Sequence, residues 1–320
     1  MPTKTKHKNR HSMYIKRGSR YRKKFKGGKI TTRRKITFRK AVCSPKRKTG
    51  SYTCYTTSAL KKLKDLWNAR HPELAITSNS EQEIWKSLRN YMAYACETEQ
   101  CWLRQQFAKK SLGPELMNYT FAPIAPSSWK KNPRKWLNSL DIGNVMKQYE
   151  QRFPTFAFIG PSPIDFDKRL QYDTCVWDEL CNFNLKKHIS NGKHMIGIIF
   201  NVDPHNKPGA HWISLVVHIR DKYVMFFDST GDPPQNEIKV LMKRIMEQGK
   251  QLGIDLEKHI NTQNHQKQNT ECGIYSIYIL SELLQDHKTK DDFLSGNITD
   301  NEMFNLRKEI FNLTDGTISS

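Results

Sequence analysis

Three apolar runs, MIGIIFNVD (195–203), HWISLVVHI (211–219) and YVMFFDS (223–229), determine the fold that this sequence predicts. Each run is rich in β-branched and aromatic residues and has the length of a strand, so we expect three neighbouring strands. Only a short polar turn at 220–222 separates the second run from the third, which makes them an antiparallel pair. Helical spacing on both sides of the runs then predicts an α+β fold, a central mixed sheet flanked by helices.

The antiparallel pair brings two polar residues together. His211 stands at the start of one strand and Asp228 at the end of the next, so pairing across the turn places them near each other. A carboxylate on one ring nitrogen holds a histidine in the tautomer whose other nitrogen can take a proton. Each residue alone also fits an ordinary strand edge or turn. Together they are a candidate general base and the acid that orients it.

A candidate nucleophile follows downstream. The apolar spacing from Cys272 to Leu284 predicts a helix with Thr270 as its cap. A thiol at a helix N-terminus feels the positive end of the macrodipole, which favours the thiolate, and a protonated His211 nearby favours it further. Gly273 is expected to leave open space beside the sulfur for a substrate carbonyl. A single cysteine in such a place is more often a small buried apolar residue.

An acyl-transfer site also needs hydrogen-bond donors for the oxyanion. The backbone amide of Cys272 is one candidate, and the side-chain amide of Gln266 or of Gln268 is the other. The order of histidine at a strand start, aspartate at the next strand end, then glutamine and Cys-Gly at a helix start favours catalysis over a chance arrangement.

By composition the whole chain divides into three parts. Residues 1–50 contain 20 of the 53 Lys and Arg and none of the 31 Asp and Glu, which leaves a nearly neutral body of 33 basic and 31 acidic residues. Such dense like charge without apolar periodicity predicts a disordered arm. Residues 51–129 are expected to form a small helical domain followed by a Pro-rich connector, and residues 130–320 the second domain. The arm could bind DNA or RNA phosphates, or be only a solvated tail or a targeting signal.

The seven cysteines are odd in number and unevenly spaced, so reduced thiols are expected. Cys96 and Cys101 form a single C-x4-C pair, for which helix packing is favoured over zinc binding. No apolar stretch approaches 18 residues and no signal peptide is visible, so we expect a soluble intracellular protein without a membrane span.

The segments G-A-H-W (209–212), F-F-D-S (226–229) and H-Q-K-Q-N-T-E-C-G (265–273) resemble the signature of the Ulp-type, adenain-like cysteine proteases. They are similar in particular to the SUMO-like polyprotein-processing proteases of large DNA viruses, of the African swine fever virus type. Trp136-Leu137-Asn138 resembles the segment that opens the catalytic domain in this superfamily. The resemblance covers roughly residues 130–312, and the basic arm has no counterpart in it.

The resemblance implies roles for residues at matching positions. Cys272 would be the nucleophile, His211 the base, Asp228 the third member and Gln266 the oxyanion donor, with Gln268 as the fallback. Trp212, together with Gly273, would line the channel that holds the substrate glycine. No cofactor or metal is implied.

The same resemblance implies a substrate class and a location. The enzyme would cleave after Gly, at Gly-Gly-X or Gly-X sites, in a viral structural polyprotein during virion maturation, in the virion and at assembly sites in the host cytoplasm. The pair Gly27-Gly28 lies in the arm, so self-cleavage after Gly28 is a further expectation. An isopeptidase acting on host ubiquitin or SUMO, an acetyltransferase, and a nucleic-acid-binding virion protein remain alternatives.

Overall fold

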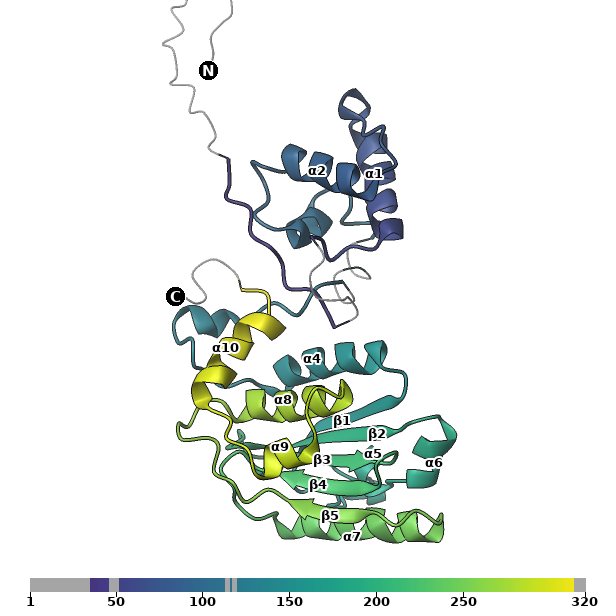
Figure 1. The fold of residues 1–320 in the computed structure, drawn as a ribbon, viewed down its shortest axis with the longest axis vertical. Coiled ribbons are helices and arrows are strands. Elements are labelled where there is room, and N and C mark those ends of the chain that lie inside the picture. Colours follow the sequence, from purple (N-terminus) through teal and green to yellow (C-terminus); the bar gives the residue numbers. More distant parts are fainter. Residues whose placement is uncertain (1–34, 46–51, 113–115, 117–119, 314–320) are drawn as a thin grey trace, which may run out of the picture. The chain divides into compact units, whose positions relative to one another are not determined.

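A mixed sheet of five strands forms the centre of the fold (Figure 1). The strands follow the order β1-β2-β3-β4-β5, and the pairs β1–β2 and β4–β5 are parallel while the two inner pairs are antiparallel. This arrangement confirms the predicted central mixed sheet. The strand bounds are β1 Phe156–Pro163, β2 Met195–Asn201, β3 Trp212–His218, β4 Tyr223–Phe227 and β5 Glu257–Ile260.

The computed structural model describes residues 35–45, 52–112, 116 and 120–313, and the elements described belong to one unit that begins at Ile36. The self-cleavage site predicted after Gly28 lies outside these residues. The α-helices are α1 Thr57–Arg70, α2 Glu81–Tyr91, α4 Ser139–Arg152, α5 Asp178–Cys181, α6 Leu185–Ser190, α7 Asn236–Gln251, α8 Cys272–Leu284, α9 Lys290–Leu294 and α10 Asp300–Ile310. The 3-10 helices are η1 Pro72–Leu74, η2 Glu99–Arg104, η3 Ser127–Lys130 and η4 Gln171–Asp173.

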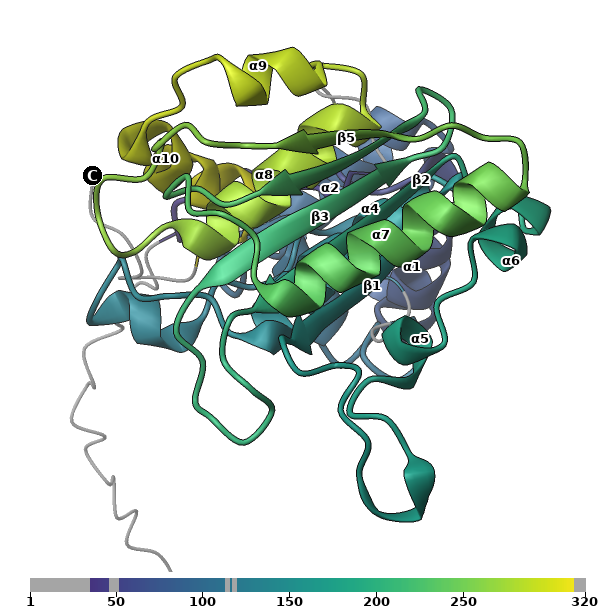
Figure 2. The same cartoon turned by 90° about the horizontal axis from the view of Figure 1, so that it is seen from below.

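Helices cover both faces of the sheet, and strand β3 shows how the sequence specifies this. Trp212 and Val216 pack into a core shared with α4 and α8, whereas Ile213, Leu215 and Val217 pack into a second core shared with α7. Because successive side chains of a strand point to opposite faces, an unbroken apolar run has both faces buried. Figures 1 and 2 show α4 and α8 on one face and α7 on the other.

The helix that carries Cys272 is unusually deeply buried. Most side chains of α8 are inaccessible, and the helix contacts β2, β3, α4 and α10. Its N-cap is Glu271, and the cap predicted at Thr270 is wrong because the Thr270 hydroxyl donates to the Glu271 carboxylate instead.

The helical region before the sheet has its own core and two disulfides. Its apolar residues cluster around α1, α2 and η2. Disulfides join Cys43 to Cys54 and Cys96 to Cys101, and a third joins Cys175 to Cys181 near α5. The expectation of reduced thiols is therefore wrong for six of the seven cysteines, and Cys96–Cys101 is neither a packing pair nor a zinc site. The odd number of cysteines corresponds to three disulfide-bonded pairs and one free thiol.

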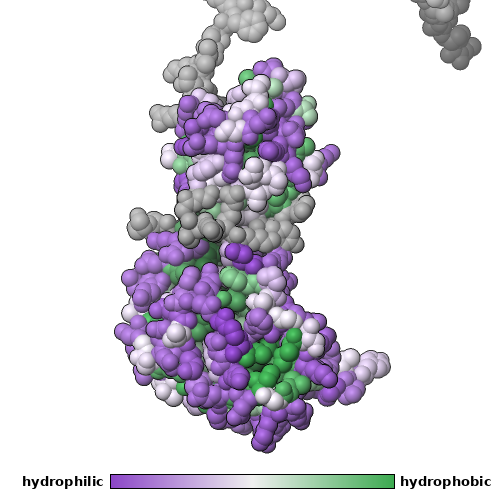
Figure 3. Space-filling view, turned by 45° about the vertical axis from the view of Figure 1, so that its right-hand side comes forward, coloured by the Kyte–Doolittle hydropathy of each residue, from purple (hydrophilic) through white to green (hydrophobic). Residues whose placement is uncertain are grey.

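The surface in Figure 3 is mostly hydrophilic, with hydrophobic residues gathered in a patch on the sheet-containing region. Within the described residues, no helix has the length and apolar character needed to cross a bilayer.

Candidate active site

The pairing of β3 with β4 places His211 beside Asp228, as the sequence predicts. His211 Nε2 and Asp228 Oδ1 lie 2.7 Å apart. The same carboxylate oxygen accepts hydrogen bonds from the Thr230 amide at 2.9 Å and from the Thr230 hydroxyl at 2.8 Å. Asp228 is almost completely buried, and its backbone carbonyl accepts from the Asn261 side chain at 2.7 Å. Contacts other than the one with the imidazole therefore hold the carboxylate in place.

The segment that leads into His211 is held by the end of β2. Asn201 Oδ1 accepts from the amides of Ala210, at 3.1 Å, and Asp203, at 3.0 Å. Gly209 adopts φ +97°, and a Cβ there would stand 2.8 Å from the Asn201 side-chain nitrogen. Glycine at this position is required both by its left-handed conformation and by the close approach of Asn201. The imidazole therefore projects from a braced segment.

Cys272 lies at the first turn of α8 with its side chain buried. All seven cysteines fall within the described residues, and Cys272 is the one that is not disulfide-bonded. It lies close enough to His211 to be one of the groups that raise the pKa of the imidazole. Because Nε2 of His211 faces Asp228, the nitrogen left for the sulfur is Nδ1.

The pKa of His211 shows the effect of these neighbours. Burial alone lowers it, but hydrogen bonds and charge from Asp228 and Cys272 outweigh burial and raise the pKa to about 10. His211 is consequently an imidazolium at neutral pH. A protonated histidine beside a cysteine at a helix N-terminus is the arrangement that cysteine nucleophiles use.

The glutamines lie near the nucleophile but are engaged elsewhere. Gln266 Oε1 accepts from the Ser229 hydroxyl at 2.7 Å, and its Nε2 donates to the Gln268 carbonyl at 2.6 Å. The Gln268 side chain is solvent-exposed. Gln266 retains one further N–H, so its role as oxyanion donor stays a prediction, as does the fallback role of Gln268.

A cleft of about 540 Å³ lies next to residues that flank His211 in sequence, although neither His211 nor Cys272 lines it. Gly209 and Trp212, on either side of His211 in sequence, line it together with Trp136 and Leu137 from the segment before α4. Trp212 Nε1 donates to the Leu137 carbonyl at 3.0 Å, and Trp136 Nε1 donates to the Asn269 carbonyl at 2.6 Å. Both indoles are therefore fixed in place, and Trp136 ties the cleft wall to the segment that carries Cys272.

Gly273 does not leave the open space that the sequence suggested. A Cβ at this position would stand 3.2 Å from Trp212 Cδ1, 3.3 Å from Leu137 Cβ and 3.4 Å from Ile142 Cδ1. Glycine here lets α8 pack closely against the Trp212 indole. Trp212 lines the cleft, whereas Gly273 packs against Trp212 and is not among the residues that line the cleft.

Sequence reasoning missed two charged residues at the site, Glu271 and Arg307. Glu271 immediately precedes the nucleophile, and its side chain forms a fully buried ion pair with Arg307 from α10. A glutamate next to the candidate cysteine was visible in the sequence. Nothing in the spacing marked Arg307, which lies 35 residues downstream of Cys272, as its partner.

Comparisons with known proteins agree with the geometry. Residues 179–319 match the Ulp1 protease family, C-terminal catalytic domain, a range that includes His211, Asp228 and Cys272. The chain is 27% identical over 244 residues to a protein of Acanthamoeba polyphaga mimivirus named as a thiol protease, a match covering 75% of this chain and 77% of the relative. It is 23% identical over 255 residues to the SUMO-1 cysteine protease of African swine fever virus, covering 74% and 91%.

A solved structure shows the same fold. The crystal structure of the African swine fever virus protease superimposes with a TM-score of 0.58 at 20% identity, over 87% of this chain and 98% of that one. The match covers more of the chain than the catalytic domain alone.

Proposed function

We propose that this cysteine protease, whose residues 179–319 match the Ulp1 protease family, is an endopeptidase that cleaves after glycine, at Gly-Gly-X or Gly-X sites, in structural polyproteins of a large DNA virus. The observation that supports this specificity is the cleft lined by Trp136 and by Trp212, the residue that follows His211. Both indoles are tied by hydrogen bonds to backbone carbonyls, so they cannot easily swing away from a bulky substrate residue. A substrate segment without Cβ atoms fits such a site best.

The proposed reaction proceeds in two stages. The Cys272 thiolate attacks the carbonyl carbon of the scissile glycine, and the tetrahedral oxyanion forms next to the start of α8, where the Cys272 amide and Gln266 are the proposed donors. The His211 imidazolium then protonates the leaving amine, and the C–N bond breaks to give a thioester. Water, deprotonated by the now neutral His211, attacks the thioester and releases the carboxylic acid and the thiol. Asp228 holds the imidazole throughout.

A peptide panel tests the specificity. It carries Gly-Gly-X, Gly-X, Ala-Gly-X, Gly-Ala-X and Ala-Ala-X sites, with Cys272→Ala protein as the blank. We expect kcat/KM to fall by about tenfold or more when the scissile glycine becomes alanine, because one added methyl in a closed channel costs about 1–3 kcal/mol. Equal cleavage of the glycine and alanine peptides would contradict the proposal.

The same panel, extended with ubiquitin and SUMO fused through their C-terminal glycines to a reporter, separates the isopeptidase alternative. Cleavage of the fusions with short peptides left intact would assign the chain to modifier removal. Incubation with acetyl-CoA and a lysine peptide tests the acetyltransferase alternative, since an acetyl thioester on Cys272 would be visible by mass spectrometry.

We further propose that residues 1–50 bind nucleic acid, which would concentrate the enzyme on its substrate during particle assembly in the virion and the host cytoplasm. The supporting observation is the concentration of 20 cationic residues without any acidic residue in this segment. A salt titration of DNA binding compares the full chain with a chain starting at Lys35, which keeps the Cys43–Cys54 disulfide, and equal slopes would dismiss the idea. Identical N-termini in wild-type and Cys272→Ala protein, read by mass spectrometry, would likewise dismiss self-cleavage after Gly28.

A further inference from the structure

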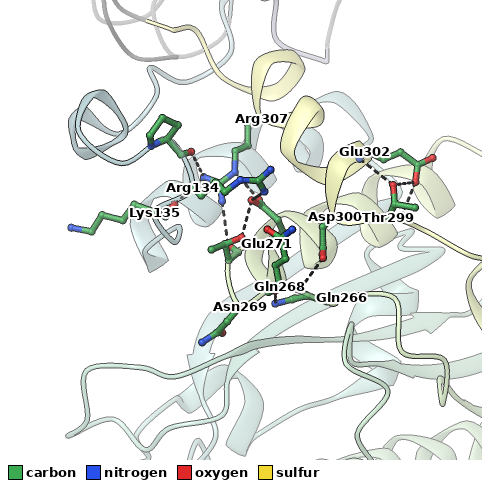
Figure 4. Close-up of polar contacts among 12 residues, drawn as sticks. Arg134, Lys135, Gln266, Gln268, Asn269, Glu271, Thr299, Asp300, Glu302 and Arg307 are labelled. Carbon is green, nitrogen blue, oxygen red and sulfur yellow. Dashed lines mark hydrogen bonds and ion pairs between the residues drawn. The ribbon is translucent and has the colours of Figure 1, made fainter. Parts of the chain in front are cut away.

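A buried ion pair lies directly against the nucleophile. Arg307 Nε donates to Glu271 Oε2 at 2.6 Å, and both side chains are completely inaccessible. Glu271 is the residue before Cys272 and the N-cap of α8, whereas Arg307 comes from α10 near the C-terminus. Figure 4 shows the guanidinium of Arg307 reaching from α10 toward Glu271.

The guanidinium of Arg307 makes further contacts around the nucleophile segment. Its Nη1 donates to the Lys135 carbonyl at 2.8 Å and its Nη2 to the Thr270 carbonyl at 3.1 Å. Its other side lies 4.4 Å from the centroid of the Trp129 ring. One side chain therefore links the Thr270–Glu271 backbone to the segment that continues into Trp136 and the cleft wall.

The same helix holds the other end of the segment. Asp300, at the start of α10, accepts hydrogen bonds from the amides of Lys267 at 2.9 Å and Gln268 at 2.8 Å. Figure 4 shows Asp300 and Arg307 on α10, with Gln266, Gln268 and Glu271 on the segment they hold. Helix α10 thus fixes the chain between residues 267 and 271 by one carboxylate and one guanidinium.

Stability alone does not account for such a pair, because a well-packed apolar pair of similar volume is often as stable or more so. Its position gives it a chemical consequence, because an uncompensated carboxylate next to Cys272 would disfavour the thiolate. We propose that Arg307 is a positioning residue for the nucleophile: it neutralises Glu271 and anchors the segment that ends in Cys272, thereby setting both the place of the sulfur and the charge that it experiences.

The charged groups around the thiol determine whether the thiol or the thiolate of Cys272 is favoured. His211, which Asp228 holds from β4, supplies a positive charge from the β3 side, and Glu271 supplies a negative charge from the adjacent residue. Arg307 compensates Glu271 from α10, and Arg134 adds a second, part-exposed contact to Glu271 at 3.4 Å. Burial lowers the pKa of Arg307, while Glu271 and, to a smaller degree, Cys272 act to raise it.

The experiment measures the rate at which iodoacetamide alkylates Cys272 as a function of pH, with the modified peptide identified by mass spectrometry. Because the other six cysteines are bonded, one thiol is read. Arg307→Met should raise the pH midpoint of alkylation by about one unit and Glu271→Gln should lower it by a similar amount, since each removes one of two opposite charges. The double variant should return to within about 0.3 units of wild type. Midpoints that move in the same direction, or do not move in folded protein, would overturn the electrostatic role.

Two further variants keep the test decisive. Arg307→Lys retains the charge but loses the planar fork, so the midpoint should stay while kcat for peptide cleavage falls about tenfold at unchanged KM; a wild-type kcat would overturn the positioning role. Arg134→Met is the matched control, because it removes a cation from the same carboxylate at a part-exposed site and should shift the midpoint by less than about 0.3 units. If a single variant leaves a buried charge that prevents folding, the double variant, which buries none, must fold and keep the wild-type midpoint.

The inference concerns the same site as the proposed function but can be judged without it. Alkylation needs no substrate, so a chain that cuts none of the glycine peptides still gives the midpoints. If Cys272 is not the nucleophile, Cys272→Ala protein retains activity on whichever substrate the enzyme accepts. That result would contradict the proposed function, and the alkylation midpoints would still decide the role of Arg307.

Discussion

The helical region around α1 and α2 and the region around the sheet are stabilised in different ways. The first packs short helices around a modest aromatic core and carries two disulfides, Cys43–Cys54 and Cys96–Cys101. The second buries both faces of a five-stranded sheet, and at its centre it holds an unbonded thiol. Two of the three disulfides therefore stand where local helices bury less surface, whereas the third, Cys175–Cys181, lies near α5, and the reactive cysteine stands inside the packed sheet region.

Two reagents probe this difference. A reagent that reduces disulfides acts on Cys43–Cys54 and Cys96–Cys101 of the first region and on Cys175–Cys181 of the second, whereas a reagent that modifies free thiols acts on Cys272.

Replacement of the free thiol should abolish catalysis and leave both regions folded. Cys272→Ala removes the nucleophile, and we expect kcat/KM on a cleaved peptide to fall by at least about 10⁴-fold. The lost sulfur is a small buried group, so the melting temperature should change by only a few degrees. Steady-state kinetics and a thermal melt on the same preparation check both points. Residual activity near the wild-type level would show that another residue attacks the substrate.

Removing the charge on Asp228 should weaken catalysis and narrow its pH range. The carboxylate helps to raise the pKa of His211 to about 10, and the imidazole must be protonated to release the leaving amine. In wild type the alkaline fall of kcat/KM should therefore lie near pH 10. In Asp228→Asn it should move to lower pH, because loss of the carboxylate lets the pKa of His211 fall. We expect a loss of about 10²-fold at neutral pH.

The matched control for this change is Asp232→Asn. Asp232 is exposed and accepts from the same Thr230 hydroxyl as Asp228. Its substitution by Asn therefore makes the same chemical change one contact further from the imidazole. It should alter kcat/KM by less than about twofold, because exposed charges are screened by solvent. An equal effect of both substitutions would mean that general surface charge, and not the His211 contact, determines the activity.

Opening a disulfide in the helical region should lower stability without touching the reactive site. Cys43→Ala with Cys54→Ala opens a bridge of sequence separation 11, for which loop-closure entropy predicts a loss of about 3 kcal/mol. Cys175→Ala with Cys181→Ala, of separation 6, should cost about 2 kcal/mol. Denaturant unfolding measures both losses, and alkylation of Cys272 in folded protein should keep its wild-type rate. A change in that rate by the first pair would show that the two regions are not separable.

Much of the sheet and the His211–Asp228 contact could be predicted from the sequence, because they depend on local patterns. Apolar runs of strand length and a short turn define β3 and β4, and their register places the two residues together. The disulfides could not be predicted, because pairing depends on distances between segments that the spacing of cysteines does not encode.

The details around Cys272 depended on contacts between distant segments. The cap predicted at Thr270 was wrong because the Thr270 hydroxyl donates to the Glu271 carboxylate. That carboxylate is held in place by Arg307, a partner that no local pattern reveals. The surroundings of Gly273 were wrong for the same reason, since Trp212 and Leu137 reach it from other elements. At both positions, contacts from distant segments determine a structure that differs from the one predicted from local sequence.

The smallest effect should come from Gly273→Ala, which tests how closely packing in the sheet region fixes the cleft. The added Cβ would stand 3.2 Å from Trp212 Cδ1 and 3.3 Å from Leu137 Cβ, so these groups must move by a few tenths of an ångström. Alanine also favours the helix over glycine by about 1 kcal/mol, which offsets an overpacking cost of about 1–3 kcal/mol. The net loss of stability should therefore be about 1 kcal/mol.

The displaced indole of Trp212 should nevertheless be visible in substrate binding. We expect KM for glycine peptides to rise roughly fivefold with kcat nearly unchanged, well below the roughly 10²-fold effect that a 1 Å misplacement of reacting groups can produce. Gly253→Ala is an unsuitable control because Gly253 has φ +74°, whereas Gly143→Ala, in α4 with its nearest contact at 3.7 Å, adds the same methyl group to a helix at a roomier position. If Gly143→Ala raises KM as much as Gly273→Ala does, the contact with Trp212 does not fix the cleft.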